Sequence, residues 1–183
     1  MIRSIFGIWA LLAAAGTSGA MAGTTMEIAG VAYPPAAFNA FCARERSICS
    51  TKGTRKVVEL TKARKAELSK VNLSVNSQVA ERSDYETTGN ADDWRVPRDK
   101  GDCEDFAILK KRELMRRGWP SSALLLTVAI SGGEGHTVLT VRTKDGDLIL
   151  DNRTSSIKDW SRTPYNYFAR QSQSNGKNWD RIR

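Results

Sequence analysis

One cysteine of this chain stands among acidic residues at the predicted start of a helix. Asp102 can cap this helix, and Glu104 and Asp105 suit its positively charged end. Unpaired N–H groups and the helix dipole at that end favour the thiolate form of Cys103, whereas the three carboxylates raise the pKa of the thiol. A nucleophilic Cys103 therefore needs a nearby cation, and the alternative is a half-buried structural cysteine.

The chain contains a single histidine, His136, which follows the glycine-rich segment GGEG and opens a predicted strand. The pair Asp145–Gly146 predicts a tight hairpin turn, after which the strand LIL ends at Asp151. His136 and Asp151 should therefore lie at the same end of a sheet. A two-residue turn at this pair would place Asp151 opposite Thr140, roughly 13 Å along the strand from His136, so a bulge or a wider loop must close the gap.

Cysteine, histidine and aspartate in this order are the residues that a papain-like or transglutaminase-like centre requires. In such a centre a thiolate attacks an acyl carbon, an imidazole keeps the thiolate ionised and protonates the leaving group, and a carboxylate fixes the tautomer of the ring. His136 as an imidazolium would also be the cation that Cys103 needs among its acids. A lone histidine is usually structural, but this combination predicts a catalytic triad of Cys103, His136 and Asp151.

Residues 1–22 have the features of a secretory signal. A basic residue near the start precedes an apolar stretch, and residues 20–22 form a small-x-small cleavage motif before Gly23. The apolar stretch is short for a bilayer-spanning helix, although an uncleaved anchor is the alternative. We therefore expect a periplasmic or secreted protein without stable membrane insertion, with one domain over residues 23–183.

Three cysteines in an oxidising compartment can form one disulfide. Cys42 and Cys49 lie in one local segment, and a bond between them would leave Cys103 as the free thiol. Pairing of Cys103 with either of the other two would exclude a nucleophilic role. We expect the local pair, Cys42–Cys49.

The chain is basic, with a formal net charge of +8, and residues 1–22 contribute one arginine and no acid to this total. The basic residues are scattered, and the sequence contains neither an aromatic-rich RNA motif nor a zinc-ligand pattern. Nucleic acid is therefore not an expected partner. For an exported protein, a basic charge favours solubility and acidic partners.

The remaining segments predict helices before the cysteine and strands after it. Pro34–Pro35 suits the start of a helix, and apolar residues at three- and four-residue spacing predict a longer helix over residues 54–82, either continuous or broken near Asn72–Asn76. Residues 83–100 have the composition of a loop. A buried strand fits residues 122–130, and the aromatic residues of the tail are expected to pack back onto the sheet.

The runs GDCEDFAILKKREL, HTVLTV and LILDN, with DDWRVP upstream, resemble the bacterial transglutaminase-like cysteine peptidases, a family that includes periplasmic adhesin-releasing proteases. This resemblance implies a papain-like α+β fold, in which N-terminal helices and the nucleophile helix pack on an antiparallel sheet. It also implies a triad at Cys103, His136 and Asp151.

In adhesin-releasing members of the family, the acids that flank the nucleophile also bind calcium. The matching positions here are Asp102, Glu104 and Asp105, and a bound Ca²⁺ would offset their charge around the thiol. Plain helix capping is the alternative role for these acids. The Cys42–Cys49 segment and the tail FARQSQSNGKNW look more like the short exported members than the adhesin proteases.

The expected function is an exported, monomeric cysteine endopeptidase that acts on a protein substrate through an acyl-enzyme, with Ca²⁺ as a candidate cofactor. Transfer of the acyl group to an amine, as in transglutaminases, uses the same residues and is equally compatible with the sequence. A catalytically silent binding module with the same fold is the third hypothesis.

Overall fold

The computed structural model describes residues 23–183, so the predicted signal segment lies outside the described residues. The helices are α1 (Phe38–Arg44), α2 (Arg46–Cys49), α3 (Lys62–Gln78), α4 (Asp84–Thr88) and α5 (Cys103–Arg116), with 3₁₀ turns η1 (Ser121–Ala123) and η2 (Trp160–Arg162). The main strands are β1 (Ile28–Ala32), β4 (Leu124–Ser131), β5 (Glu134–Thr143), β6 (Gly146–Leu150), β7 (Lys158–Asp159), β8 (Asn166–Gln171) and β9 (Trp179–Ile182). Strands β2 (Ala80–Glu81) and β3 (Lys100–Gly101) form a separate parallel pair.

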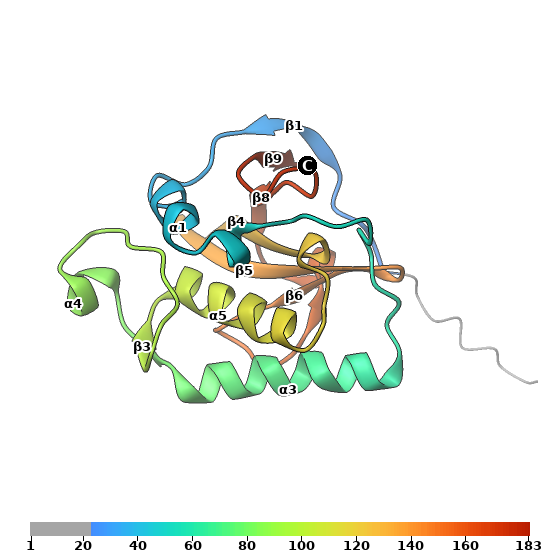
Figure 1. Cartoon of the computed structure of the whole chain (residues 1–183), viewed down its shortest axis with the longest axis horizontal. Coiled ribbons are helices and arrows are strands. Elements are labelled where there is room, and N and C mark those ends of the chain that lie inside the picture. Colours follow the sequence, from blue (N-terminus) through green and yellow to red (C-terminus); the bar gives the residue numbers. More distant parts are fainter. Residues whose placement is uncertain (1–22) are drawn as a thin grey trace, which may run out of the picture.

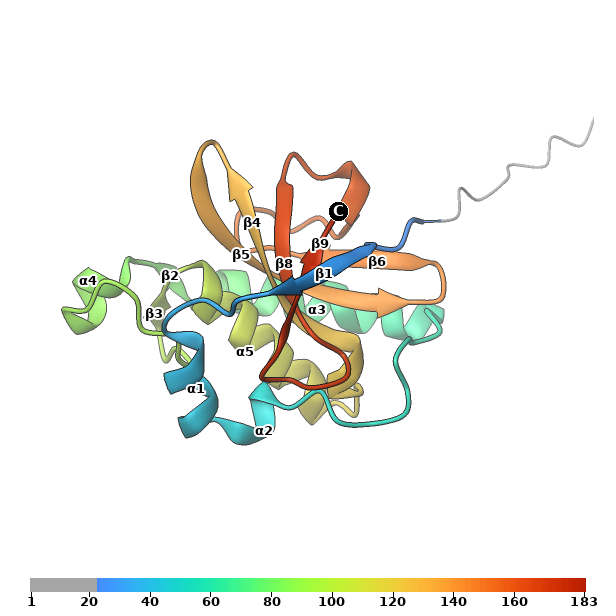
Figure 2. The same cartoon turned by 90° about the horizontal axis from the view of Figure 1, so that it is seen from above.

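Seven antiparallel strands form the central sheet in the order β1-β9-β8-β4-β5-β6-β7. Helix α5 packs against β4 and β5, and α3 packs on the other side of α5, along the lower edge of Figure 1. The N-terminal strand β1 pairs with β9 at one edge of the sheet (Figure 2). These layers confirm the predicted α+β fold class. Between residues 23 and 183, no helix has the length and apolar character that crossing a membrane requires.

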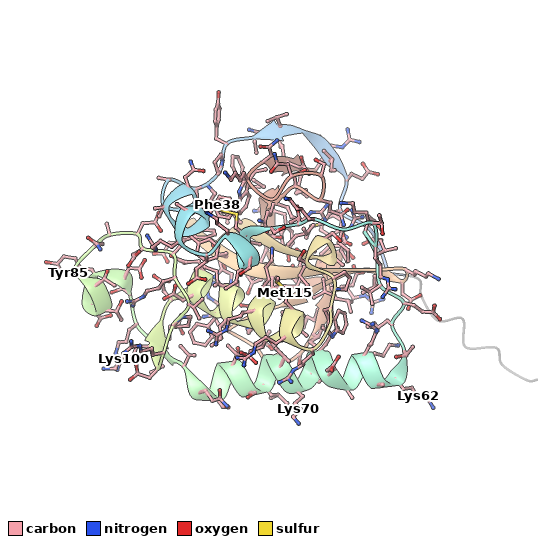
Figure 3. All side chains as sticks on the ribbon, viewed as in Figure 1. Phe38, Lys62, Lys70, Tyr85, Lys100 and Met115 are labelled. Carbon is pink, nitrogen blue, oxygen red and sulfur yellow. A yellow bond between two sulfur atoms is a disulfide. The ribbon has the colours of Figure 1, made fainter. Side chains whose placement is uncertain are left out.

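Helix α3 is shorter than the helix predicted over residues 54–82. It begins after Thr61, whose hydroxyl accepts a hydrogen bond from the N–H of Arg64 at 3.2 Å, as an N-cap does. The preceding segment is extended because buried Val58 bridges to Thr143 of β5. The helix is continuous through Asn72–Asn76. Lys62 and Lys70 extend from its outer side, as Figure 3 shows, while the opposite side faces α5.

The segment predicted as a loop over residues 83–100 contains the short helix α4. Ser83 and Glu86 form a capping box, in which the Ser83 hydroxyl accepts from the Glu86 N–H and the Glu86 carboxylate accepts from the Ser83 N–H. The sequence SDYE is the signature of this box. Gly89, with a φ of 77°, then ends the helix in the left-handed conformation.

His136 lies inside strand β5 and is not its first residue as predicted. Gly132 and Gly133, with φ values of 62° and 91°, make a two-residue turn between β4 and β5. Both angles are positive, as the turn that suits a right-handed hairpin twist requires. Strand β5 therefore starts at Glu134, and His136 pairs opposite Ala129 of β4.

The turn between β5 and β6 lies one residue earlier than predicted. Thr143 pairs with Gly146, so the two loop residues are Lys144 and Asp145. The Thr143 hydroxyl stabilises this turn, since it accepts from the Asp145 N–H at 3.2 Å and donates to the Gly146 carbonyl. Leu150 consequently pairs with Leu139, and the pairing has no register shift.

This register removes the predicted gap between the histidine and the aspartate. Asp151 follows Leu150 and therefore lies level with Val138, two residues from His136. Side chains two residues apart point to the same face of a strand. No bulge is needed, and the two side chains reach each other directly.

The aromatic tail contributes two strands to the sheet and does not simply pack on it. Trp179 of β9 is buried, and its ring meets those of Phe38 and Trp94 edge-on at centroid distances of 5.0 and 6.2 Å. Such edge-to-face pairs stabilise a core beyond the burial of their area. The predicted disulfide, Cys42–Cys49, joins α1 and α2 beside this cluster.

Candidate active site

Cys103 is the first residue of α5 and is the only free cysteine among the described residues. Its Sγ accepts a hydrogen bond from the backbone N–H of Thr137 at 3.3 Å and donates to Oε2 of Glu104 at 3.2 Å. Thr137 directly follows His136 on β5. The packing of α5 against β5 therefore brings the thiol to the strand that carries the histidine.

The ring of His136 is buried and held by Asp151. Its Nε2 lies 2.9 Å from Oδ1 of the Asp151 carboxylate. Its Nδ1 is buried and has no hydrogen-bond partner within residues 23–183. Because Asp151 occupies Nε2, Nδ1 is the ring nitrogen that remains available to exchange a proton with a thiol or a substrate.

Two further groups hold the Asp151 carboxylate. The backbone N–H of Arg153 donates to Oδ1 at 3.1 Å, and the hydroxyl of Tyr165 donates to Oδ2. Burial alone would raise the pKa of Asp151, but the hydrogen bonds from His136, Tyr165 and Arg153 outweigh it, so the pKa is lowered. The ring of Tyr165 also lies against that of His136, with centroids 5.1 Å apart.

Two asparagines of α3 hold the loop that follows Asp151. The side-chain amide of Asn76 donates to the Asp151 carbonyl at 2.9 Å and to the Thr154 carbonyl at 3.2 Å. Asn72 is buried and donates to the Thr154 carbonyl at 3.1 Å. These residues therefore anchor the loop that follows Asp151. The sequence had suggested a possible helix break at their positions.

Three carboxylates gather beside the thiol. Asp84 from α4, Asp102 and Glu104 each offer an oxygen, and these oxygens all lie within 4.8 Å of one another. Asp102 has the backbone position of a helix N-cap, but its side chain makes no capping hydrogen bond. Asp105 is directed elsewhere, since its Oδ1 accepts from the N–H of Arg95 at 3.0 Å. Of the three predicted acids, the structure thus brings two together and adds Asp84.

The electrostatics of this cluster oppose ionisation of the thiol. Burial and the charge of Asp102 raise the pKa of Glu104 to about 9. Burial and the charge of Glu104 raise the pKa of Cys103 above its ordinary value. The thiolate is therefore accessible at neutral pH only if a cation offsets the carboxylates or if a neighbouring base takes the proton.

The donor set of the cluster suits a hard cation. Asp84 Oδ1 and Asp102 Oδ1 are buried and have no hydrogen-bond partner in the described part of the chain. Carboxylate oxygens without hydrogen-bond donors are the ligands that Ca²⁺ prefers, in flexible coordination completed by water or backbone carbonyls. Asp84, Asp102 and Glu104 could therefore hold such an ion.

Sequence reasoning missed Asp84, Tyr165, Asn72 and Asn76. A signal existed only for Asp84, which occupies the second position of the capping-box sequence SDYE, inside the predicted loop. The other three are ordinary polar or aromatic residues in the sequence. Their roles arise because α3 and the residue before β8 contact Asp151 and the segment after it.

Comparisons with known proteins agree with this geometry. The model of the family described as bacterial transglutaminase-like cysteine proteinase BTLCP matches residues 28–183. No curated protein sequence matches the chain. Among solved structures, calcium-bound LapG of Legionella pneumophila has a TM-score of 0.52 and 30% identity, over 75% of this chain and 77% of that one. EGTA-treated LapG has a TM-score of 0.51 and 31% identity, over 73% and 70%.

Proposed function

This chain belongs to the bacterial transglutaminase-like cysteine proteinases and is a cysteine peptidase, and we propose that Cys103, His136 and Asp151 form its catalytic triad. Two observations carry this proposal: Cys103 Sγ lies 3.3 Å from the backbone nitrogen of Thr137, the residue next to His136, and His136 Nε2 lies 2.9 Å from the Asp151 carboxylate. The buried, unpartnered Nδ1 of His136 supports it further.

The reaction follows from these positions. Asp151 accepts from Nε2–H and so keeps Nδ1 unprotonated, and Nδ1 takes the proton of the Cys103 thiol. The thiolate forms a bond to the carbonyl carbon of the scissile peptide, and the imidazolium gives its proton to the departing amine. Water then attacks the thioester, His136 takes one proton from it, and the carboxylic acid product leaves as Cys103 recovers its hydrogen.

Asp84, Asp102 and Glu104 form the proposed calcium site. The related LapG of Legionella pneumophila has a calcium-bound structure, and the three acids here offer a set of hard oxygen ligands that suits the same ion. Bound calcium would supply two positive charges beside the thiol. The ligands come from α4 and from both neighbours of Cys103, so they would also fix the start of α5 relative to the 83–101 segment.

The proposed setting is the periplasm or the exterior of the cell, where the domain over residues 23–183 acts as a monomer on a protein substrate. The signal-like sequence of residues 1–22 supports export. The Cys42–Cys49 disulfide supports it independently, because such bonds form and persist in oxidising compartments.

A search for new chain ends tests the proposed activity. The protein beginning at Gly23 is incubated with Ca²⁺ and with cell-surface proteins of its source, and new amino termini are identified by mass spectrometry. We expect termini that appear with the wild type and not with Cys103→Ala. Equal termini in both samples would contradict a Cys103 peptidase, and new isopeptide cross-links without new termini would identify an acyl transferase instead.

Tyr165→Phe is expected to lower kcat/KM by about 10-fold, since a hydrogen bond to a charged carboxylate is lost. Without that donor the pKa of Asp151 rises, so the acid side of the pH–activity profile moves to higher pH. Tyr167→Phe is the matched control on β8, because the Tyr167 hydroxyl bonds Thr163 Oγ1 at 2.9 Å. Identical profiles for both variants would exclude the positioning role of Tyr165.

A further inference from the structure

The backbone of Gly23 lies in a socket that has no room for a side chain. A Cβ built on Gly23 would lie 2.2 Å from the Asp145 carbonyl oxygen and 2.5 Å from Oδ2 of Asp159. A Cβ on Gly146 would lie 2.8 Å from the Gly23 Cα. The two glycine backbones therefore touch, beside the turn that joins β5 to β6. In Figure 1 the blue start of the coloured chain lies next to this hairpin.

Asp159 places a fixed negative charge in this socket. Its carboxylate accepts from the Thr24 N–H at 2.9 Å, from the Thr24 hydroxyl at 3.0 Å and from the Ser161 N–H at 3.0 Å. Burial would raise the pKa of Asp159, but the hydrogen bonds from Ser161 and Thr24 outweigh it and lower the pKa. Within residues 23–183, Asp159 forms no salt bridge with a lysine, arginine or histidine.

We propose that this socket is a binding site for the chain's own processed amino terminus, the α-ammonium group of Gly23, which pairs with Asp159. The proposal rests on the proposed export. A signal peptidase would hydrolyse the bond between residues 22 and 23, with water supplying the hydroxyl of the new carboxyl group and a hydrogen of the new amine. The amine is protonated at neutral pH and carries a charge that the peptide nitrogen lacked.

The backbone of Gly23 lies close to the Asp159 carboxylate. The Gly23 nitrogen is two bonds of about 1.5 Å each from the Cβ position, so it lies within about 5.5 Å of Asp159 Oδ2. At that distance in a partly buried site, an ammonium and a carboxylate attract each other appreciably. Glycine, the residue that the cleavage motif of residues 20–22 places first, is also the residue that the socket accepts.

The socket opens onto a cavity that other charged groups also line, and their charges act on the same ammonium group. Lys65 of α3, Arg162 of η2 and Asp145 of the turn all contribute to its wall. Two acids therefore face two cations, and the ammonium adds a third cation within about 5.5 Å of the Asp159 carboxylate. Asp147, on the neighbouring strand β6, already binds the following residues, since its N–H donates to the Thr24 carbonyl at 2.8 Å and its Oδ2 accepts from the Met26 N–H at 3.0 Å.

The test compares chains that differ only at the amino terminus. All carry Cys103→Ala, so the result does not depend on peptidase activity. One chain begins with free Gly23 and the other with N-acetylated Gly23, and each is also made with Asp159→Asn and with the control change Asp180→Asn. At pH 6.5 we expect the chain with the free terminus to have a Tm about 3 °C above that of the acetylated chain, both without a second change and with Asp180→Asn. With Asp159→Asn, the free and acetylated chains should have the same Tm.

The pH dependence gives a second readout. Pairing raises the pKa of the α-ammonium above its ordinary value of about 8, so its stabilisation is complete below that pH and disappears as the pH rises through the higher folded value. The Tm difference should therefore vanish by about pH 10. Equal Tm values at pH 6.5, or a difference that survives Asp159→Asn, would overturn the proposal, as would an exported protein whose first residue is not Gly23.

Discussion

His136→Ala is expected to lower kcat/KM for peptide cleavage by about 10⁴-fold, and Cys103→Ala should lower it at least as much. His136 is the base that takes the thiol proton and the acid that releases the amine, so both bond-making and bond-breaking depend on it. The double variant should be no worse than Cys103→Ala, because residues that act as a unit have non-additive effects. Steady-state cleavage of a substrate identified from its new termini measures these rates.

The same substitution at two aspartates, one inside and one outside the triad, provides a matched control for this prediction. Asp151→Asn should also reduce kcat/KM, by about 10²-fold or more, since an amide cannot hold the imidazolium as a carboxylate does. Asp180→Asn makes the same chemical change on β9 and should leave the rate unchanged. Retention of more than a tenth of the activity in His136→Ala, with circular dichroism unchanged, would contradict the triad.

Asp84→Asn is expected to weaken calcium binding by at least about 10-fold, because one of three carboxylate ligands becomes neutral. In the wild type, Ca²⁺ at 100 times its Kd should stabilise the fold by about 2.7 kcal/mol, and at the same Ca²⁺ concentration the variant should lose at least about half of this gain. Isothermal titration calorimetry measures the affinity, and melting with Ca²⁺ or EGTA measures the stabilisation. Peptidase activity of the wild type should fall when EGTA is added.

The matched control for the calcium site lies on the same helix. Glu104→Gln removes a proposed ligand, whereas Glu113→Gln removes an equal charge from α5, where Glu113 pairs with Arg112 and Arg116. Only Glu104→Gln should reduce calcium affinity. If both changes reduced calcium affinity equally, the ion would be held by general electrostatic attraction and not by a specific site. A wild-type Tm that does not change with Ca²⁺ would exclude the calcium site.

Local signals in the sequence were sufficient to predict the helix that carries the Cys103 thiol. Asp102 and the acidic residues of the first turn lie within a few residues of the helix start, and α5 has the predicted start. The free state of Cys103 followed in the same way from the short separation of Cys42 and Cys49. Such features depend on neighbours in the sequence and are readable without the fold.

The register between strands β5 and β6 could not be predicted from local sequence signals. The pair Asp145–Gly146 favours a turn by its composition, but Gly146 is instead the first residue of β6, with a φ of 121°. A contact distant in sequence contributes to this outcome, because Gly146 packs against the backbone of Gly23. The shift decides whether Asp151 reaches His136, and the contact that accompanies it joins residues far apart in the sequence.

Residues that complete the site come from remote segments. Asp84 reaches the nucleophile because α4 packs next to β3, and Tyr165 reaches Asp151 from the position just before β8. The tail was not recognised as two strands because its polar residues are buried. Arg170 and Gln171 of β8 lie inside the fold, where they bond Asp147 and Lys111, so the usual alternation of polar and apolar residues is absent.

The most direct test of the triad is the rate at which iodoacetamide alkylates Cys103, followed from pH 5 to 10 in Ca²⁺ for the wild type and for His136→Ala. If His136 takes the thiol proton, the wild type should react rapidly at pH 7, well below the ordinary thiol pKa of about 8.5, and His136→Ala should react only at high pH. Equal rates for the two proteins across this range would contradict the account.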